Sequence, residues 1–182
     1  MRRADEELLR DARGGDRQAW AELFDRHQRR IYRFVLQMRG STAVADEVVQ
    51  ETFLDLLRGG LRFDASKGSL AAYLLGVARL KSRRLAGDRR WEQPEDALAA
   101  IASPEADGAQ RVAVQQRDAV LRSAVAALPD HYREPIVLCE LNELSYEEAA
   151  AVMDCPVGTV RSRLHRGKQM LAERLAPLWG KL

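Results

Sequence analysis

The fold is decided by the stretch from Leu144 to Arg166, which reads LSYEEAAAVMDCPVGTVRSRLHR. Ser145 and Glu148 have the spacing of a capping box, in which each side chain accepts a hydrogen bond from the other residue's backbone amide at the start of a helix. Pro156 breaks the run and suits the first position of a second helix. The stretch therefore predicts two short helices joined by a tight turn, a helix-turn-helix.

The second of these helices has one apolar and one polar face. Its apolar face holds Val157, Val160, Leu164 and Leu171. Gly167 should keep that packing surface close to its neighbour. Arginine offers two donors that match the acceptors of guanine in the major groove, and Ser or His can bond to base edges or phosphates. The DNA-binding candidates are Thr159, Arg161, Ser162, Arg163, His165, Arg166 and Lys168, and the alternative is an ordinary solvated helix face.

The rest of the chain is predicted to be helical as well. Apolar residues recur at three- and four-residue spacing, and alternating runs of Val, Ile and Thr are absent. Helices are predicted over 16–38, 42–58 and 69–85, and helical spacing resumes at 112–128. Pro135 should either kink or begin the helix that follows Pro129. The predicted core residues are Trp20, Leu23, Phe24, Ile31, Phe34, Val35 and Met38, then Ala45, Val48, Val49, Thr52, Phe53, Leu56 and Leu57, then Leu70, Tyr73, Leu74, Val77 and Leu80.

Periodicity fails between Gly87 and Gln110, where Pro94, Pro104 and several acids suggest a linker, with a short helical piece at 96–101. We therefore expect an all-α protein with two small helical domains joined by a flexible linker. The expected boundaries are 1–90 for the first domain, 91–111 for the acidic linker and 112–182 for the domain that contains the helix-turn-helix.

Charge is distributed unevenly along the chain, although the net charge is only +2. One basic cluster spans 79–90 and another spans 161–168, whereas 92–107 contains five acids and no Lys or Arg. Two basic patches separated by an acidic connector suggest two separate contacts with polyanions. Either patch alone could also be a solvated surface.

Other classes of protein find little support in the sequence. Its 182 residues are 46% apolar and 31% charged, with no apolar run long enough to span a membrane and no secretory leader, so we expect a cytoplasmic protein. Cys139 and Cys155 form no C-x-x-C motif and are interpreted as idle thiols. His27, His131 and His165 are scattered and no nucleophile motif is present, so we expect no enzyme, metal or cofactor.

The helix-turn-helix resembles the −35-reading element of group-4, or extracytoplasmic-function (ECF), sigma factors of the sigma-70 family. The resemblance rests on 144–150 and 155–164, and the lead-in over 128–134 is similar to the one usual in that family. In the N-terminal half, 45–53 (ADEVVQETF) resembles the polymerase-binding helix of the family, and 62–64 with 68–69 match the loop before its −10-reading helix. Two motifs in the right order are far more specific than either one alone.

The resemblance implies a subunit that binds core RNA polymerase and directs it to promoters through −35 and −10 elements. It implies polymerase contacts from Asp46, Glu47, Gln50, Glu51 and Leu54, because an acidic face with one exposed leucine combines electrostatic steering with an apolar anchor. It implies contacts with the melted −10 strand from Phe63, Lys67, Ser69, Leu70, Arg79, Leu80, Lys81, Arg83 and Arg84. The chain departs from the family pattern at Tyr73, Leu80 and Arg84, so the −10 base preference does not carry over.

Two further expectations concern partners and alternatives. Such factors are usually held inactive by an anti-sigma protein that contacts both domains, so the resemblance implies an anti-sigma partner. The main rival interpretation is a stand-alone helix-turn-helix regulator, which explains 144–166 but not the first 90 residues. Copurification with core polymerase distinguishes the two, because a repressor binds duplex DNA without it.

Overall fold

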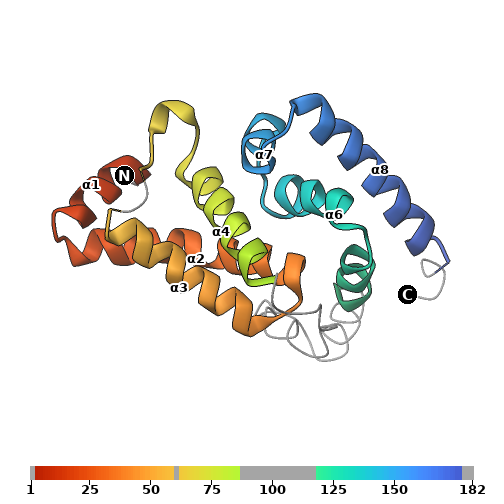
Figure 1. Cartoon of the computed structure of the whole chain (residues 1–182), viewed down its shortest axis with the longest axis horizontal. Helices are drawn as coiled ribbons and strands as arrows, with labels where there is room; N and C mark the ends of the chain where they lie inside the picture. Colours follow the sequence, from red (N-terminus) through yellow and green to blue (C-terminus); the bar gives the residue numbers. More distant parts are fainter. Residues whose placement is uncertain (1–2, 60–61, 87–117, 178–182) are drawn as a thin grey trace, which may run out of the picture.

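The computed structural model describes residues 3–59, 62–86 and 118–177, and all regular structure in these ranges is helical (Figure 1). This confirms the predicted all-α fold. The predicted linker at 91–111, the short helix at 96–101, and Arg89 and Arg90 lie outside the described residues. In chain order the elements are α1 (Asp5–Arg13), α2 (Arg17–Arg39), α3 (Thr42–Leu57), the 3-10 turn η1 (Ala65–Lys67), α4 (Leu70–Ala86), a helix over 118–126, α6 (Asp130–Ile136), the π-helical turn η3 (Val137–Leu141), α7 (Tyr146–Met153) and α8 (Val157–Leu175).

The boundaries of α2 and α3 follow from caps that the sequence supplies. The Asp16 carboxylate accepts hydrogen bonds from the backbone amides of Gln18 and Ala19, at 2.8 and 3.1 Å, and so satisfies donors at the start of α2. Gly40 ends α2 with a φ of 72°, a left-handed conformation that glycine adopts without strain. Ser41 then caps α3 through the amide of Val44. Both helices lie within a residue of their predicted ends.

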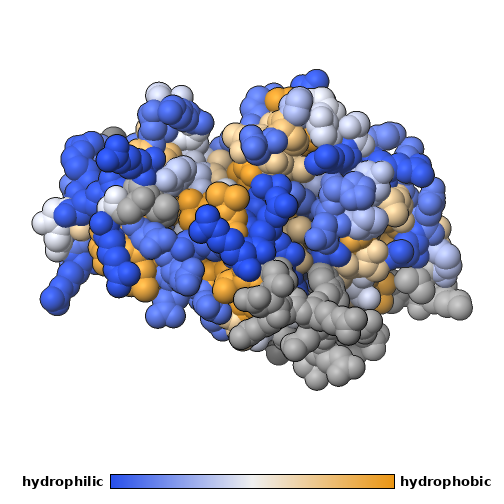
Figure 2. Space-filling model, viewed as in Figure 1, coloured by the Kyte–Doolittle hydropathy of each residue, from blue (hydrophilic) through white to orange (hydrophobic). Residues whose placement is uncertain are grey.

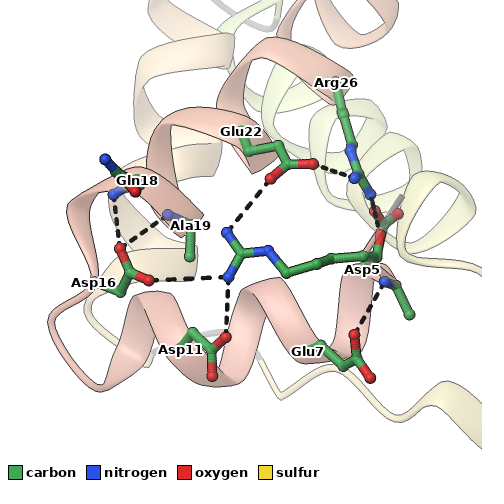
Figure 3. A network of polar contacts seen from close by, with 10 residues as sticks. Asp5, Glu7, Asp11, Asp16, Gln18, Ala19, Glu22 and Arg26 are labelled. Atoms are coloured by element: carbon green, nitrogen blue, oxygen red, sulfur yellow. Dashed lines mark hydrogen bonds and ion pairs between the residues drawn. The ribbon is translucent and has the colours of Figure 1, made fainter. Parts of the chain in front are cut away.

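Helix α1 was not among the predicted helices, and ion pairs join it to α2 (Figure 3). Arg26 of α2 donates to Asp5 at 2.8 Å and also bonds to Glu22. Arg3 adds contacts with Asp11 at 3.2 Å and with Glu22 at 3.4 Å. Beneath this network α1 buries apolar side chains against the bundle, so the helix is an integral part of the N-terminal half.

The predicted core of the N-terminal half is confirmed except at Leu57 and Leu80, which are exposed, and at Val77, which is only half-buried. Leu57 closes α3 at the surface, where it is 44% exposed. Leu80 is 55% exposed because α4 is packed on two sides, by α2 and α3 and by α7, and buries Leu75 and Ala78 instead. The residues confirmed as buried are Leu23, Ile31, Phe34, Val35, Met38, Ala45, Val48, Val49, Thr52, Phe53, Leu56, Leu70 and Leu74, while Trp20, Phe24 and Tyr73 are partly buried and pack against them.

In the C-terminal half, α6 and α7 pack against the inner side of α8, and η3 packs against α6 and α7. Pro135 neither begins nor ends α6 but lies inside its last turn, and the chain continues directly into the π-helical turn η3. Proline lacks the amide that the regular helical ladder needs, so a change of helix type at this position is physically reasonable. Pro135 therefore does not begin the helix, as one of the two predicted alternatives required, and the irregularity that follows it is the change from α6 to the π-helical turn.

The two halves lie against each other, with α4 facing α7 and α6 (Figure 1). Most of their buried apolar side chains form one continuous cluster, while Leu128, Ile136 and Leu164 form a second cluster within the C-terminal half. The guanidinium of Arg133, which is only 4% exposed, donates to the carbonyl oxygen of Met38 in the other half at 3.2 Å and to that of Leu128 at 2.7 Å. The contact is thus both apolar and hydrogen bonded.

Candidate functional site

The helix-turn-helix is formed by α7 and α8, with the capping box in place at its start. The Glu148 amide donates to the Ser145 hydroxyl at 3.1 Å, and the Ser145 amide donates to the Glu148 carboxylate at 3.0 Å. Asp154 ends α7 in a left-handed conformation with a φ of 52°. Pro156 precedes the first residue of α8 instead of occupying it, a shift of one position from the prediction. The local signals in the sequence therefore specify this unit almost residue by residue.

Helix α8 is held by close packing on its inner side. Val160 and Leu164 are buried there, as predicted. Gly167 lies so near α6 that a Cβ atom would sit 2.7 Å from Cδ1 of Ile136 and 3.0 Å from the carbonyl oxygen of Tyr132. These contacts fix the rotation of α8 and so determine which of its side chains face outward.

The outer face of α8 presents most of the DNA-binding candidates to solvent. Arg161, Ser162, His165, Arg166 and Lys168 are exposed, whereas Thr159 and Arg163 are half-buried. The Arg161 guanidinium lies over the ring of Tyr146, 5.7 Å from its centroid, which links the outer faces of α7 and α8. Lys168 is paired with Glu140 at 2.7 Å, so its charge is partly compensated.

A second exposed face lies on α3. Asp46, Glu47, Gln50, Glu51 and Leu54 are all exposed and follow one another along a single side of the helix. The face combines three carboxylates with one apolar side chain, which agrees with the pattern expected from the sequence.

Beside this face lies a groove between α2 and α3, of about 570 Å³. Its α3 wall includes Asp46 and Gln50, and its α2 wall includes Phe24, Arg29 and Tyr32. Burial, together with the nearby charge of Asp46, raises the pKa of the Tyr32 phenol, which therefore stays neutral at physiological pH. None of these three α2 residues was predicted as a site residue, and Phe24 was predicted only as part of the core, because the sequence does not show which face of α2 borders α3.

The loop before α4 carries several of the −10 candidates in different environments. Phe63 is half-buried against Tyr73, with ring centroids 5.6 Å apart. Lys67 has a side chain that is 82% exposed. Ser69 is exposed and donates to Glu148 of α7 at 2.5 Å, whereas Leu70 is only 2% exposed and packs in the core.

The cationic candidates on α4 also differ in their surroundings. The guanidinium of Arg79 donates twice to the Glu134 carboxylate of α6, at 2.5 and 3.3 Å, and both side chains are nearly buried. Lys81 reaches back to α3, where it meets Asp55 at 2.7 Å and Glu51 at 3.2 Å. Arg83 and Arg84 are exposed. Figure 2 shows apolar patches among hydrophilic residues, including patches over α3 and α4. The exposed large apolar side chains of these two helices are Leu54, Leu57 and Leu80.

Two of the −10 candidates are thus bonded to carboxylates of the C-terminal half, Ser69 to Glu148 and Arg79 to Glu134. Partial burial would raise the pKa of Glu148, but hydrogen bonds from Ser69 and Ser145 outweigh it and hold the pKa below its ordinary value. The carboxylate is therefore charged near neutral pH. In this arrangement the C-terminal half covers part of the α4 surface that carries the −10 candidates.

Within residues 3–59, 62–86 and 118–177, no three His, Cys, Asp or Glu side chains gather into a group that could hold a metal ion. The helices in the same ranges include none that is long and apolar enough to cross a membrane.

Comparison with known proteins gives concordant matches to both halves. Residues 23–92 match the family "Sigma-70 region 2", and residues 118–171 match "Sigma-70, region 4". The ECF RNA polymerase sigma-E factor of Escherichia coli K12 is 34% identical over an alignment of 189 residues, which covers 96% of this chain and 95% of that protein. The ECF sigma factor SigE of Mycolicibacterium smegmatis is 32% identical over 161 residues, and the match covers 87% of this chain but only 62% of that longer relative.

Two solved structures share the fold. CnrH, in complex with the cytosolic domain of CnrY, superposes with a TM-score of 0.71 at 26% identity, covering 96% of this chain and 99% of CnrH. The sigma factor RpoE of Bartonella quintana, in complex with the anti-sigma factor NepR, has a TM-score of 0.61 at 24% identity over 82% of this chain and 91% of that one.

Proposed function

The chain belongs to the extracytoplasmic-function RNA polymerase sigma factors of the sigma-70 family, and we propose that it binds core RNA polymerase and directs it to promoters through −35 and −10 elements. The observation that carries the proposal is the display of two chemically opposite faces on one chain. One is the cationic outer face of α8, and the other is the acidic face of α3. Members of this family are not enzymes, so the proposed role is one of recognition in transcription initiation.

Helix α8 is proposed to read the −35 element in the major groove. Each arginine can donate two hydrogen bonds to one guanine, and a good bidentate contact of this kind is worth about 1–3 kcal/mol of discrimination against the wrong base. The contact between Arg161 and Tyr146 restricts the guanidinium before DNA arrives, which lowers the entropy lost on binding. Of the proposed set, Thr159, Ser162, Arg163, His165, Arg166 and Lys168 would contact base edges or phosphates around Arg161.

The acidic face of α3 is proposed to dock on core polymerase. Carboxylates at Asp46, Glu47 and Glu51 would steer a basic partner surface, while Gln50 and the exposed Leu54 would provide polar and apolar contacts at short range. The groove beside Asp46 extends this face onto α2 and could accept a side chain from the partner.

The loop 62–69 and α4 are proposed to hold the melted −10 strand, with Phe63 and Tyr73 as a stacking platform and Lys67, Arg83 and Arg84 as phosphate contacts. Leu80 is well exposed on the same helix and would meet the strand as an apolar contact. The buried Leu70 would act by positioning the loop. The proposed division remains 1–90 for this module, 91–111 for the linker and 112–182 for the −35 reader.

The halves must separate before both elements can be read. The element names place the sites about 25 base pairs apart, roughly 85 Å at ~3.4 Å per pair, which exceeds the reach of a compact chain. Opening would release Ser69 and Arg79 from Glu148 and Glu134. Since RpoE of Bartonella quintana was solved in complex with the anti-sigma factor NepR, we propose that an anti-sigma protein similarly binds this chain in the cytoplasm and keeps it from polymerase.

Two sets of variants test the assignment of the faces. Charge reversal by Asp46→Lys together with Glu51→Lys should lower the affinity for core polymerase and leave binding of duplex −35 DNA intact. Arg161→Ala or Arg166→Ala should do the opposite, weakening −35 binding about tenfold or more at constant polymerase affinity. Unchanged footprints and transcript levels in the arginine variants, or unchanged pull-down of core in the reversal variant, would show that the corresponding face is wrongly placed.

A further inference from the structure

Lys81 lies where the helix proposed to face the −10 strand meets the helix proposed to dock on polymerase. It belongs to α4, but its ammonium group lies 2.7 Å from Oδ2 of Asp55 and 3.2 Å from Oε2 of Glu51, both on α3. Its side chain is only 17% exposed, against 47% for Glu51 and 41% for Asp55. We call this three-residue contact the Lys81 bridge.

Within the Lys81 bridge, the carboxylate of Glu51 has two possible partners, Lys81 and polymerase. Glu51 is part of the acidic face of α3, so a basic surface of polymerase would compete with Lys81 for it. Lys81 in turn is flanked on α4 by the exposed Leu80 and the exposed Arg83 and Arg84, but its own charge is turned away from solvent and neutralised by α3.

We infer that Lys81 couples polymerase docking to DNA binding. In the free chain the two carboxylates of α3 hold the charge of Lys81. When polymerase binds Glu51, only Asp55 still holds Lys81, which can then more readily bind a phosphate of the −10 strand. This inference rests on the proposed function of the two helices. It differs from a simple DNA contact, because the contact becomes available only when α3 is engaged.

Three physical points support the coupling. Partial burial works against the charge of Lys81, but the hydrogen bonds that its ammonium group donates to Asp55 and Glu51 raise its pKa, so the group is a full cation that needs an anionic partner. Phosphate can replace carboxylate as that partner without a change of protonation. A shared group of this kind must act in both directions, so DNA bound at Lys81 should also strengthen docking through Glu51.

Loss of one carboxylate from the bridge tests the inference in the full chain. Asp55→Asn removes a carboxylate outside the proposed docking residues and keeps the side-chain size. Glu6→Gln on α1 is the matched control, because it makes the same change in net charge at an exposed position remote from α4 in the sequence. Binding of a labelled single-stranded oligonucleotide is measured by fluorescence anisotropy over a series of salt concentrations, with thermal melting as a check of folding.

Asp55→Asn should bind the oligonucleotide two- to fivefold more tightly than the wild type, a range typical of a partly exposed ion pair. Its salt dependence should steepen by about 0.7 in log–log slope, which corresponds to one extra phosphate contact on a single strand. Glu6→Gln should change neither quantity. Adding Lys81→Gln to Asp55→Asn should remove the gain.

An equal gain in Asp55→Asn and Glu6→Gln, or a gain that survives Lys81→Gln, would overturn the inference. The charge reversal Asp46→Lys with Glu51→Lys tests polymerase docking on α3 separately. If that variant loses core polymerase while Glu51→Gln binds it as the wild type does, docking on α3 stands and the coupling through Glu51 is overturned.

Discussion

Gly167→Ala is the substitution for which the structure gives the clearest expectation. Gly167 lies in the middle of α8, where alanine would ordinarily stabilise a helix by about 1 kcal/mol relative to glycine. Here the added methyl group would lie 2.7 Å from Cδ1 of Ile136 and 3.0 Å from the carbonyl oxygen of Tyr132. Propensity and packing therefore act in opposite directions.

Packing should dominate. Ile136 is only 3% exposed, so its side chain has little room to move away, and the carbonyl of Tyr132 belongs to the backbone of α6. Overpacking of a close-packed interior costs typically about 1–3 kcal/mol, and we expect the upper part of this range. After the gain in helix propensity, the net loss in the free energy of unfolding should be about 1–2 kcal/mol, or about 2–8 °C in melting temperature for a chain of this size.

Gly158→Ala is the matched control in the same helix. Nothing lies within 4 Å of a Cβ atom at Gly158, so this change should be neutral or stabilising by up to about 1 kcal/mol. Thermal and denaturant unfolding followed by circular dichroism would measure both variants. If Gly167→Ala proved as stable as Gly158→Ala, the close approach of α8 to α6 would be refuted.

Three further predictions concern single residues elsewhere. Ser145→Ala should lower the free energy of unfolding by about 1 kcal/mol, because it removes the cap of α7, and Ser145→Asn should keep most of that stability. Equal stability of the wild type and both variants would contradict the cap. Burial lowers the pKa of His27 below its ordinary value of 6.5, although Asp5 opposes this shift. The unfolded chain therefore binds the proton more readily than the folded chain. The free energy of unfolding should fall as pH drops below about 6.5, by at most about 1.4 kcal/mol per pH unit. Replacing His27 by Gln should flatten that dependence in urea titrations at different pH, and an unaltered slope would exclude His27 as its source. Burial raises the pKa of the Cys139 thiol to about 11. Iodoacetamide at about pH 8 should therefore label this thiol far more slowly in the native than in the unfolded protein. Mass spectrometry can follow the labelling, and equal rates would contradict the burial of Cys139.

Features that depend on neighbours in the sequence were predicted well. The capping box at Ser145 and Glu148, the helix end at Gly40 and the close packing at Gly167 are all local or rest on a single helical periodicity. Such signals act over three or four residues, so a sequence displays them directly.

Features that depend on which elements meet in space were predicted less well. Leu80 has the spacing of a core residue, but α4 is packed on two sides and turns this leucine outward. Helix α1 was missed although its apolar residues, Leu8, Leu9 and Ala12, are buried, because a nine-residue helix carries few periods and is supported chiefly by its tertiary contacts with α2.

The pairing of Arg79 with Glu134 could not have been predicted, because 55 residues separate the two side chains and the sequence gives no distance between halves. The same holds for Lys81, whose position in a basic cluster suggested a direct DNA contact. Only the structure reveals that Glu51 and Asp55 hold it.

The central claim is that this chain directs core RNA polymerase to promoters. In vitro transcription with the purified chain, core polymerase and a library of randomised promoters tests it most directly. We expect transcripts that require both the chain and core polymerase and that are enriched for one −35 sequence, with the enrichment lost in Arg161→Ala. Binding to duplex DNA without any chain-dependent transcripts would contradict the claim and favour a stand-alone regulator.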